Sequence, residues 1–175
     1  MIVCWDLDNT LVDSGALIRD GRPIAQAWIE AVPVPGMLAF AAALRARLAG
    51  SAHVVLSVRT GSVRAETLAW LERERFGLAA DDLWLVSSPD DKPAVWRTLA
   101  RNARLIVVDD LMHGHQTAAG PLPYDALVEA ARRTADVYVG AEEIARMRAD
   151  PAEAERHAGE VAERLAALRG VSAGS

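Results

Sequence analysis

Acidic residues stand in close pairs at two places where an apolar run of the sequence ends. Asp6 and Asp8 follow the run MIVCW, and Asp109 and Asp110 follow the run RLIVV. Carboxylates that crowd together repel one another, so a divalent cation or a strong cationic partner must offset the repulsion if the pairs meet. The two pairs are far apart in the sequence, and their joint chemistry depends on a fold that brings them together.

Two further polar groups stand at comparable positions. A second apolar run, AHVVLS, ends at Ser57 and is followed by Val58 and Arg59. Lys92 is the only lysine of the chain. The proline that follows it is tolerated only in the first turn of a helix, so Lys92 is expected in that turn as well. A hydroxyl group and an ammonium group therefore join the carboxylates as candidates for one site.

Hydrophobic periodicity predicts the elements that position these groups. Strands are expected at residues 1–6, 52–57, 82–86 and 104–109, and a weaker pattern indicates a fifth at 135–139. Helices are expected at residues 36–48 and 62–76, from residue 90 or 91, and from residue 150, with a short helical pattern at 24–31. Such alternation indicates an α/β, three-layer, Rossmann-like fold, a parallel sheet with helices on both faces. Ligands bind beyond the carboxyl ends of such strands, where the polar groups would converge.

Several apolar side chains are assigned to the core. Cys4, Trp70 and Trp96 are expected to be buried, and Trp5 is expected to pack on the sheet face opposite Asp6. The last helix is predicted to begin with a capping box and a proline, residues 150–153. Its buried stripe is expected to consist of Ala154, Ala158, Val161, Leu165 and Leu168.

Length and charge limit the classes of function. The 175 residues suit a single domain, residues 1–170, followed by a disordered tail at 171–175. A formal net charge of −5 argues against a protein that grips long nucleic acid along its backbone. It leaves open a small phosphorylated ligand or the end of a nucleic-acid strand. No apolar run reaches the ~20 residues of a membrane span, and no signal peptide is recognised, so no membrane contact and a cytoplasmic location are expected.

Four segments resemble the motifs of the haloacid dehalogenase (HAD) superfamily. WDLDNTLVDS is similar to the first motif, Asp-x-Asp-x-Thr followed by Leu-Val, and VVLSVRTG is similar to the second. Lys92 matches the third motif and IVVDD the fourth, in the family's order and spacing up to about residue 120. The resemblance implies a HAD phosphatase, that is, an enzyme that hydrolyses a phosphate monoester through a phospho-aspartyl intermediate.

The resemblance also implies roles for single residues. Asp6 would attack phosphorus, and Asp8 would protonate the leaving oxygen and later take a proton from water. Ser57 would donate its hydroxyl proton to the transferring phosphoryl group, assisted by the Val58 backbone N–H. Lys92 would pair with Asp6 and the phosphate. Thr10 and Arg59 complete the predicted phosphate-binding and substrate-binding set.

Mg²⁺ is the cofactor that the resemblance implies. The Asp6 carboxylate, the Asp8 backbone carbonyl and one acid of the fourth motif would bind it, and Mg²⁺ keeps several waters in its octahedral shell. Asp110 is expected to bind the metal directly. Asp109 is expected to support the site without binding the metal directly. His113 and His115 follow this motif, and their role is left open between lining the site, binding metal and neither.

The intervals that hold cap domains in this superfamily are short here. Residues 12–35 have room for a flap, or minimal cap, and residues 60–91 for one helix and one strand. A capless enzyme is therefore expected, with an open site for a large substrate or a lid supplied by a second copy of the chain. Arg64 and Trp28 are weaker candidates for contact with the substrate.

Three functions remain open. The first is a phosphomonoesterase that acts on a nucleotide, a sugar phosphate or a biosynthetic intermediate. The second is a phosphatase that processes nucleic-acid ends, because a stretch of about 60 residues is similar in layout to the 3′-phosphatase domain of polynucleotide kinase-phosphatases. The third is a non-catalytic HAD-fold module that acts through partners. The intact acids of the first and fourth motifs favour an enzyme.

Overall fold

Five parallel strands form the central sheet. The computed structural model describes residues 1–14, 28, 30–114 and 120–172, with side chains as far as residue 168. The sheet has the order β3-β2-β1-β4-β7. Its strands are β1 (Ile2–Trp5), β2 (Ala52–Val58), β3 (Leu83–Val86), β4 (Leu105–Val108) and β7 (Val137–Val139). The predicted strands are confirmed, including the fifth.

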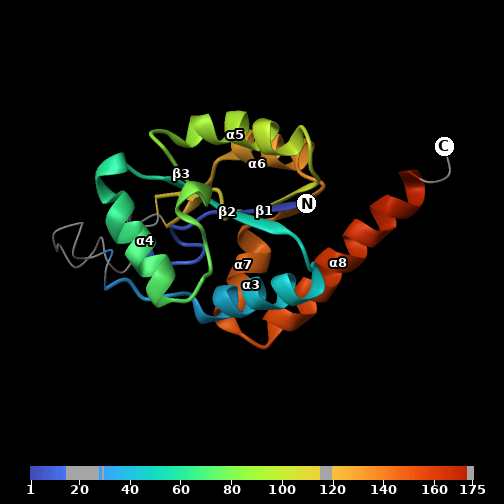
Figure 1. Ribbon diagram of the computed structural model, residues 1–175, viewed down its shortest axis with the longest axis horizontal. Helices are drawn as coiled ribbons and strands as arrows, with labels where there is room; N and C mark the ends of the chain where they lie inside the picture. The colour runs from blue at the N-terminus through green and yellow to red at the C-terminus, as the bar shows by residue number, and fades with distance from the viewer. Residues whose placement is uncertain (15–27, 29, 115–119, 173–175) are drawn as a thin grey trace.

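Helices cover both faces of this sheet, which confirms the predicted α/β three-layer architecture (Figure 1). Helices α5 and α6 lie on one face, and α3, α7 and α8 lie on the other. The helices are α3 (Pro35–Arg47), α4 (Arg64–Arg73), α5 (Lys92–Ala100), α6 (Asp125–Thr134), α7 (Ala141–Ala149) and α8 (Glu153–Ser172). Short 3₁₀ turns precede α4, β3 and α5: η1 (Gly61–Val63), η2 (Ala80–Asp82) and η3 (Pro89–Asp91).

The central position of β1 explains why the motifs meet. It pairs in parallel with β2 on one side and β4 on the other, so that Trp5 lies opposite both Val55 and Val108. The residues that follow these three strands therefore emerge at the same edge of the sheet. Asp6 continues the pairing, because its backbone N–H donates to the Val108 carbonyl at 2.8 Å.

Side chains of the strands, and of the helices and loops that cover them, build the core. Trp5 is fully buried and meets Phe40 and Phe76 edge-to-face, with ring centroids 5.8 Å apart in both pairs. Trp70 belongs to the same cluster, whereas Cys4 and Trp96 lie in the cluster on the α5 side. The predicted burial of all four residues is confirmed.

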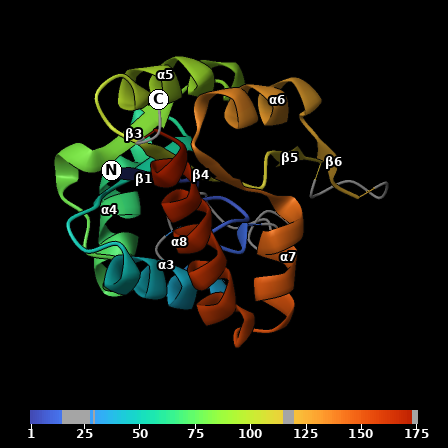
Figure 2. The same cartoon turned by 90° about the vertical axis from the view of Figure 1, so that its right-hand side faces the viewer.

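Two helices and a small hairpin were not predicted. Helix α6 buries Leu127 and Ala131, and α7 buries Ile144 and Met147. The hairpin pairs β5 (Met112–His113) with β6 (Leu122–Pro123) in antiparallel fashion, directly after β4. Figure 2 shows it between α6 and α7, extending away from the sheet.

The last helix differs from its prediction at both ends. Asp150 accepts a hydrogen bond from the Ala152 N–H, but residues 151 and 152 form a turn and α8 begins at Glu153. At the other end, α8 continues to Ser172, beyond the predicted boundary at residue 170. The buried stripe stops at Leu165, because Leu168 is 38% exposed.

The segment between β2 and α5 holds one α-helix, α4, one strand, β3, and three short turns, as expected. The segment between β1 and α3 is only partly described. Val12 bridges to Asp8 and to Pro33 there. The short helix predicted at 24–31 lies mostly outside the described residues, so the absence of a full cap stays a prediction. Among the described helices, none combines the length and hydropathy that crossing a bilayer requires.

Helices α3 and α7 touch at a glycine. A Cβ atom on Gly36 would lie 1.9 Å from the Met147 carbonyl oxygen, so only glycine fits this approach. The residue after Met147, Arg148, donates from Nη2 to the Asn9 carbonyl oxygen at 2.6 Å. Asn9 has a left-handed backbone conformation, with φ of 61°. The contact between the two helices thus adjoins the loop that follows β1.

Candidate active site

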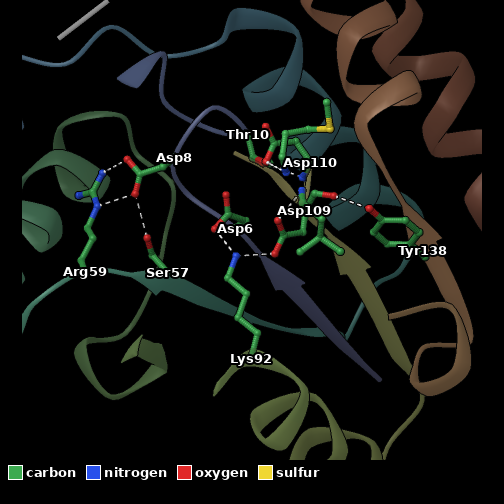
Figure 3. A network of polar contacts seen from close by, with 11 residues as sticks. Asp6, Asp8, Thr10, Ser57, Arg59, Lys92, Asp109, Asp110 and Tyr138 are labelled. Carbon is green, nitrogen blue, oxygen red and sulfur yellow. Dashed lines mark hydrogen bonds and ion pairs between the residues drawn. The ribbon is translucent and has the colours of Figure 1, made fainter. Parts of the chain in front are cut away.

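Acids from two strands and one lysine meet at the carboxyl edge of the sheet (Figure 3). Carboxylate oxygens of Asp6, Asp109 and Asp110 all lie within 4.8 Å of one another. Lys92 Nζ donates to Asp6 Oδ1 at 2.8 Å and to Asp109 Oδ2 at 2.6 Å. We call these four residues the acid cluster. The structure therefore brings together four of the residues that were predicted to share one site.

Lys92 reaches this position because of the turn that precedes it. Ser88 and Asp91 cap η3 reciprocally: Ser88 Oγ accepts from the Asp90 N–H, and Asp91 Oδ2 accepts from the Ser88 N–H. Lys92 and Pro93 lie in the first turn of α5, as predicted, although the α-helix begins at Lys92 and not at residue 90 or 91. The aliphatic part of Lys92 is buried with its head group, since the side chain is only 6% exposed.

Burial and mutual repulsion control the charges of the acid cluster. Desolvation, together with the negative charge of Asp109, raises the pKa of Asp6 to about 7. Desolvation also raises the pKa of Asp109, although Lys92 opposes this effect. For Lys92, burial lowers the pKa, but the two carboxylates more than compensate and the net shift is upward. The lysine is therefore charged, and the carboxylates retain an excess of negative charge.

Hydrogen bonds hold the two acids after β4 in place. Asp109 Oδ1 accepts from the Leu111 N–H at 3.0 Å, and the Tyr138 hydroxyl donates to the Asp109 carbonyl at 3.0 Å. Thr10 was predicted to bind phosphate, but its fully buried hydroxyl accepts from the Asp110 N–H at 3.3 Å. Thr10 thus positions the Asp110 backbone. Tyr138 was missed, because only the pairing of β7 with β4 places it beside Asp109.

Asp8 points away from the acid cluster towards Arg59 and Ser57 (Figure 3). Arg59 donates from Nη2 to Asp8 Oδ1 at 2.8 Å and from Nε to Asp8 Oδ2 at 2.9 Å. Ser57 Oγ donates to the same Oδ2 at 3.0 Å. Ser57 and Arg59 were predicted to contact phosphate or substrate, and in this structure both bind Asp8 instead.

Arg59 is itself held from two sides. Its guanidinium lies over the Trp28 ring, 3.5 Å from the centroid, and its Nη1 donates to Thr67 Oγ1 at 2.9 Å. Arg64, the weaker substrate candidate, donates to the carbonyls of Leu83 and Ala80. Arg64 therefore ties α4 to the segment around β3, and Trp28 supports Arg59.

A cavity of about 410 Å³ opens above the acid cluster. Its floor includes Asp6, Asp8 and Lys92, and the predicted Val58 also lines it. Three aromatic side chains also line it, namely Trp28, His113 and Tyr124, together with aliphatic and small polar residues such as Leu111, Met112 and Ser14. His113 is thus placed at the site, whereas His115 lies outside the described residues.

The acid cluster fits a divalent cation. Three buried carboxylates face a single ammonium group, and burial, followed by the charge of Asp109, raises the pKa of Asp6 and so disfavours its ionised form. A hard cation with oxygen ligands would remove the excess of negative charge. The donors are carboxylates alone, which suits Mg²⁺ better than a metal that prefers nitrogen or sulfur ligands.

Comparisons with known proteins give a limited result. No family model matches the sequence, and no curated protein matches it. The fold is similar to the crystal structure of a HAD family hydrolase from Deinococcus radiodurans R1 with bound phosphate and sodium. That similarity covers 87% of this chain and 95% of the other, with 16% identity and a TM-score of 0.47. A likeness of this size does not establish a family or an activity for this chain.

Proposed function

We propose that this chain is a HAD-type, Mg²⁺-dependent phosphomonoesterase with Asp6 as its nucleophile. The observation that carries the proposal is the acid cluster, in which acids from two strands meet beside one charged lysine. An ordinary structural ion pair needs one acid for each base, and here the acids are in excess. The arrangement matches the four sequence motifs that resemble this superfamily.

Some residues of the acid cluster would bind the metal, and others would position those ligands. Asp6 and Asp110 would hold Mg²⁺ through their side chains and Asp8 through its backbone carbonyl. Asp109 is better suited to support, because Lys92 and the Leu111 N–H each bind one of its carboxylate oxygens. When bound, the cation would neutralise phosphate oxygens, so that a carboxylate can approach them.

The chemistry proceeds in two displacements at phosphorus. An Asp6 oxygen forms a bond to phosphorus while the bond from phosphorus to the alcohol oxygen breaks, and Asp8 gives its proton to that oxygen. Water then attacks the phospho-aspartyl group, Asp8 takes the proton, and inorganic phosphate leaves with the Asp6 carboxylate restored. Lys92 offsets charge as Asp6 and the phosphate approach each other.

Asp8 must change its contacts to play this role. Both of its carboxylate oxygens accept hydrogen bonds from Arg59, and one also accepts from Ser57. A carboxyl group that transfers a proton must turn one oxygen towards the leaving group. Substrate would therefore open this arrangement, and the freed Ser57 hydroxyl would then reach the phosphoryl oxygens.

The decisive experiment compares phosphate release from p-nitrophenyl phosphate with Mg²⁺ and with EDTA. We expect release that requires Mg²⁺ and falls at least about 10⁴-fold in Asp6→Asn, because the nucleophile is lost. Asp81→Asn removes an exposed acid of η2 and is the matched control with wild-type activity. Equal release from Asp6→Asn, or no release from the native chain, would favour the non-catalytic module.

A further inference from the structure

The cavity above the acid cluster has an aromatic wall whose residues come from two separate segments. Trp28 precedes α3, and His113 and Tyr124 belong to the β5–β6 hairpin and its end. The rings of His113 and Tyr124 are in contact, with centroids 4.6 Å apart and planes inclined by 45°. We call these three side chains the aromatic wall. None of them takes part in the two displacements proposed above.

Backbone hydrogen bonds fix the aromatic wall relative to the acids. The Tyr124 N–H donates to the Leu111 carbonyl at 2.8 Å, which closes the base of the hairpin. The Leu111 N–H in turn donates to Asp109 Oδ1. Leu111 thus links the backbone of Tyr124 to Asp109 of the acid cluster. A group attached to a phosphate at the acid cluster would lie on the side of the cavity where Tyr124 stands.

The charges of the site limit what that group can be. The summed positive charge of one divalent cation, Lys92 and Arg59 equals the summed negative charge of the four carboxylates that line the cavity. Among the described lining residues, His113 is the other side chain that can become positive. With the acids just balanced, the described part of the cavity has no surplus positive charge for a second phosphate beside the one that reacts.

We infer that the aromatic wall binds a flat, uncharged ring in the leaving group of a phosphate monoester. The volume of about 410 Å³ suits a molecule of nucleotide size. Aromatic side chains attract flat rings through stacking, which tolerates different ring types. This inference rests on the proposed phosphatase activity and names the substrate class, a nucleoside monophosphate or a similar ring-bearing monoester.

The test uses a pair of substrates that differ in the ring alone. Adenosine 5′-monophosphate and ribose 5-phosphate share the sugar and the scissile bond. We expect kcat/KM to be at least about 10-fold higher for the nucleotide, because one stacked base contributes a factor of this order. In Tyr124→Leu and His113→Leu, the ratio of the two values should fall towards one.

Leu122→Ala is the matched control. Leu122 lies on the same hairpin, pairs with His113 and is 53% exposed, but does not line the cavity. Its variant should keep the wild-type ratio. Equal kcat/KM for the two substrates in the wild-type chain, or an unchanged ratio in both wall variants, would overturn the inference. Preference for a 3′-phosphorylated oligonucleotide over the mononucleotide would overturn it as well.

A binding measurement separates this inference from the proposed function. Calorimetry with Asp6→Asn compares the affinity for adenosine 5′-monophosphate with that for ribose 5-phosphate, without turnover. Tighter binding of the nucleotide, weakened in Tyr124→Leu, supports the aromatic wall even if the native chain releases no phosphate. Equal affinities alongside Mg²⁺-dependent phosphate release would refute the wall and leave the phosphatase standing.

Discussion

Two buried polar clusters adjoin the end of β1, and they differ in what they require from outside the chain. In the first, Trp5 Nε1 donates to His53 Nδ1 at 2.9 Å, and the two rings stack. In the second, Lys92 binds Asp6 and Asp109. Trp5 and Asp6 are consecutive residues, so one step along the chain separates a neutral cluster from a charged one.

The neutral cluster is complete in itself. Burial and the nearby charge of Arg45 lower the pKa of His53 to about 4, which leaves the ring uncharged at neutral pH. Its second nitrogen lies 3.1 Å from Ser51 Oγ. The acid cluster also has hydrogen-bond partners, yet its charges do not cancel. Under the proposed function, the comparison teaches that charge imbalance, more than burial or hydrogen bonding, separates the cluster that acts from the one that only stabilises the fold.

Replacing the lysine breaks the acid cluster most severely. Lys92→Met should destabilise the protein by about 3–5 kcal/mol, because it leaves two buried carboxylates without their partner. Activity should be lost as well. Urea unfolding measures the change, and Arg97→Met, an exposed site on the same helix, is the control. An unchanged unfolding midpoint for Lys92→Met would mean that the ion pairs contribute nothing to stability.

Replacing the arginine that holds Asp8 should have a smaller effect. Arg59→Lys keeps the charge but cannot form the two-pronged contact with Asp8, and it loses the stacking on Trp28. We expect kcat to fall by about 10–100-fold, less than the roughly 10²–10⁴-fold that a positioned acid or base contributes, because Asp8 itself remains. Steady-state kinetics test this, and wild-type kcat in the variant would show that Asp8 positions itself without Arg59.

The neutral cluster should respond in stability alone. His53→Leu leaves Trp5 Nε1 buried without an acceptor, which costs about 1–3 kcal/mol. We expect a lower unfolding midpoint and unchanged kcat/KM at a temperature where the variant is folded. A large loss of kcat/KM under those conditions would contradict the division into a structural and a functional cluster.

The smallest expected effect is the dependence of thermal stability on pH and metal. Asp6 has a pKa of about 7 in the folded, metal-free chain and its ordinary value of 3.8 when unfolded. The folded state therefore holds a proton that the unfolded state loses, so this contribution to stability is complete below about pH 4 and disappears as pH rises through 7.

Mg²⁺ should reverse that loss, because it binds the ionised carboxylates. We expect the rise in Tm on adding Mg²⁺ to be larger at pH 8 than at pH 5, with a difference of a few degrees. Differential scanning calorimetry with and without EDTA measures this difference. An equal rise at both pH values would show that ionised Asp6 takes no part in binding the cation.

The position of the acid cluster could be predicted from sequence because parallel strands impose it. Once the apolar runs were assigned to neighbouring strands, Asp6, Asp109 and Asp110 had to emerge at one edge. Lys92 followed from Pro93, which fixes where its helix begins. These predictions depend on backbone geometry, which local sequence specifies well.

The partners of individual side chains could not be predicted in the same way. Ser57 and Arg59 were placed in the right region, but their binding to Asp8 depends on rotamers and on the support of Trp28 and Thr67. Tyr138 depends on the register between β4 and β7. Such contacts join distant segments and leave no local pattern.

Helices α6 and α7 escaped prediction for a different reason. Each buries only two side chains against the rest of the protein, Leu127 and Ala131 in α6 and Ile144 and Met147 in α7. In both helices the buried residues stand three or four positions apart, which is helical spacing, so the sequence held a signal that the prediction did not use. The capless arrangement, the oligomeric lid and the cytoplasmic location stay predictions.

The glycine contact between α3 and α7 makes the loop of the first motif depend on the far end of the chain. Because Gly36 lets α7 approach, Arg148 reaches the carbonyl of Asn9, 139 positions earlier in the sequence. A fragment that stopped before α7 would retain every residue of the four motifs and still lose the hydrogen bond from Arg148 to Asn9. The shortest chain that keeps the proposed site intact is therefore longer than its four motifs.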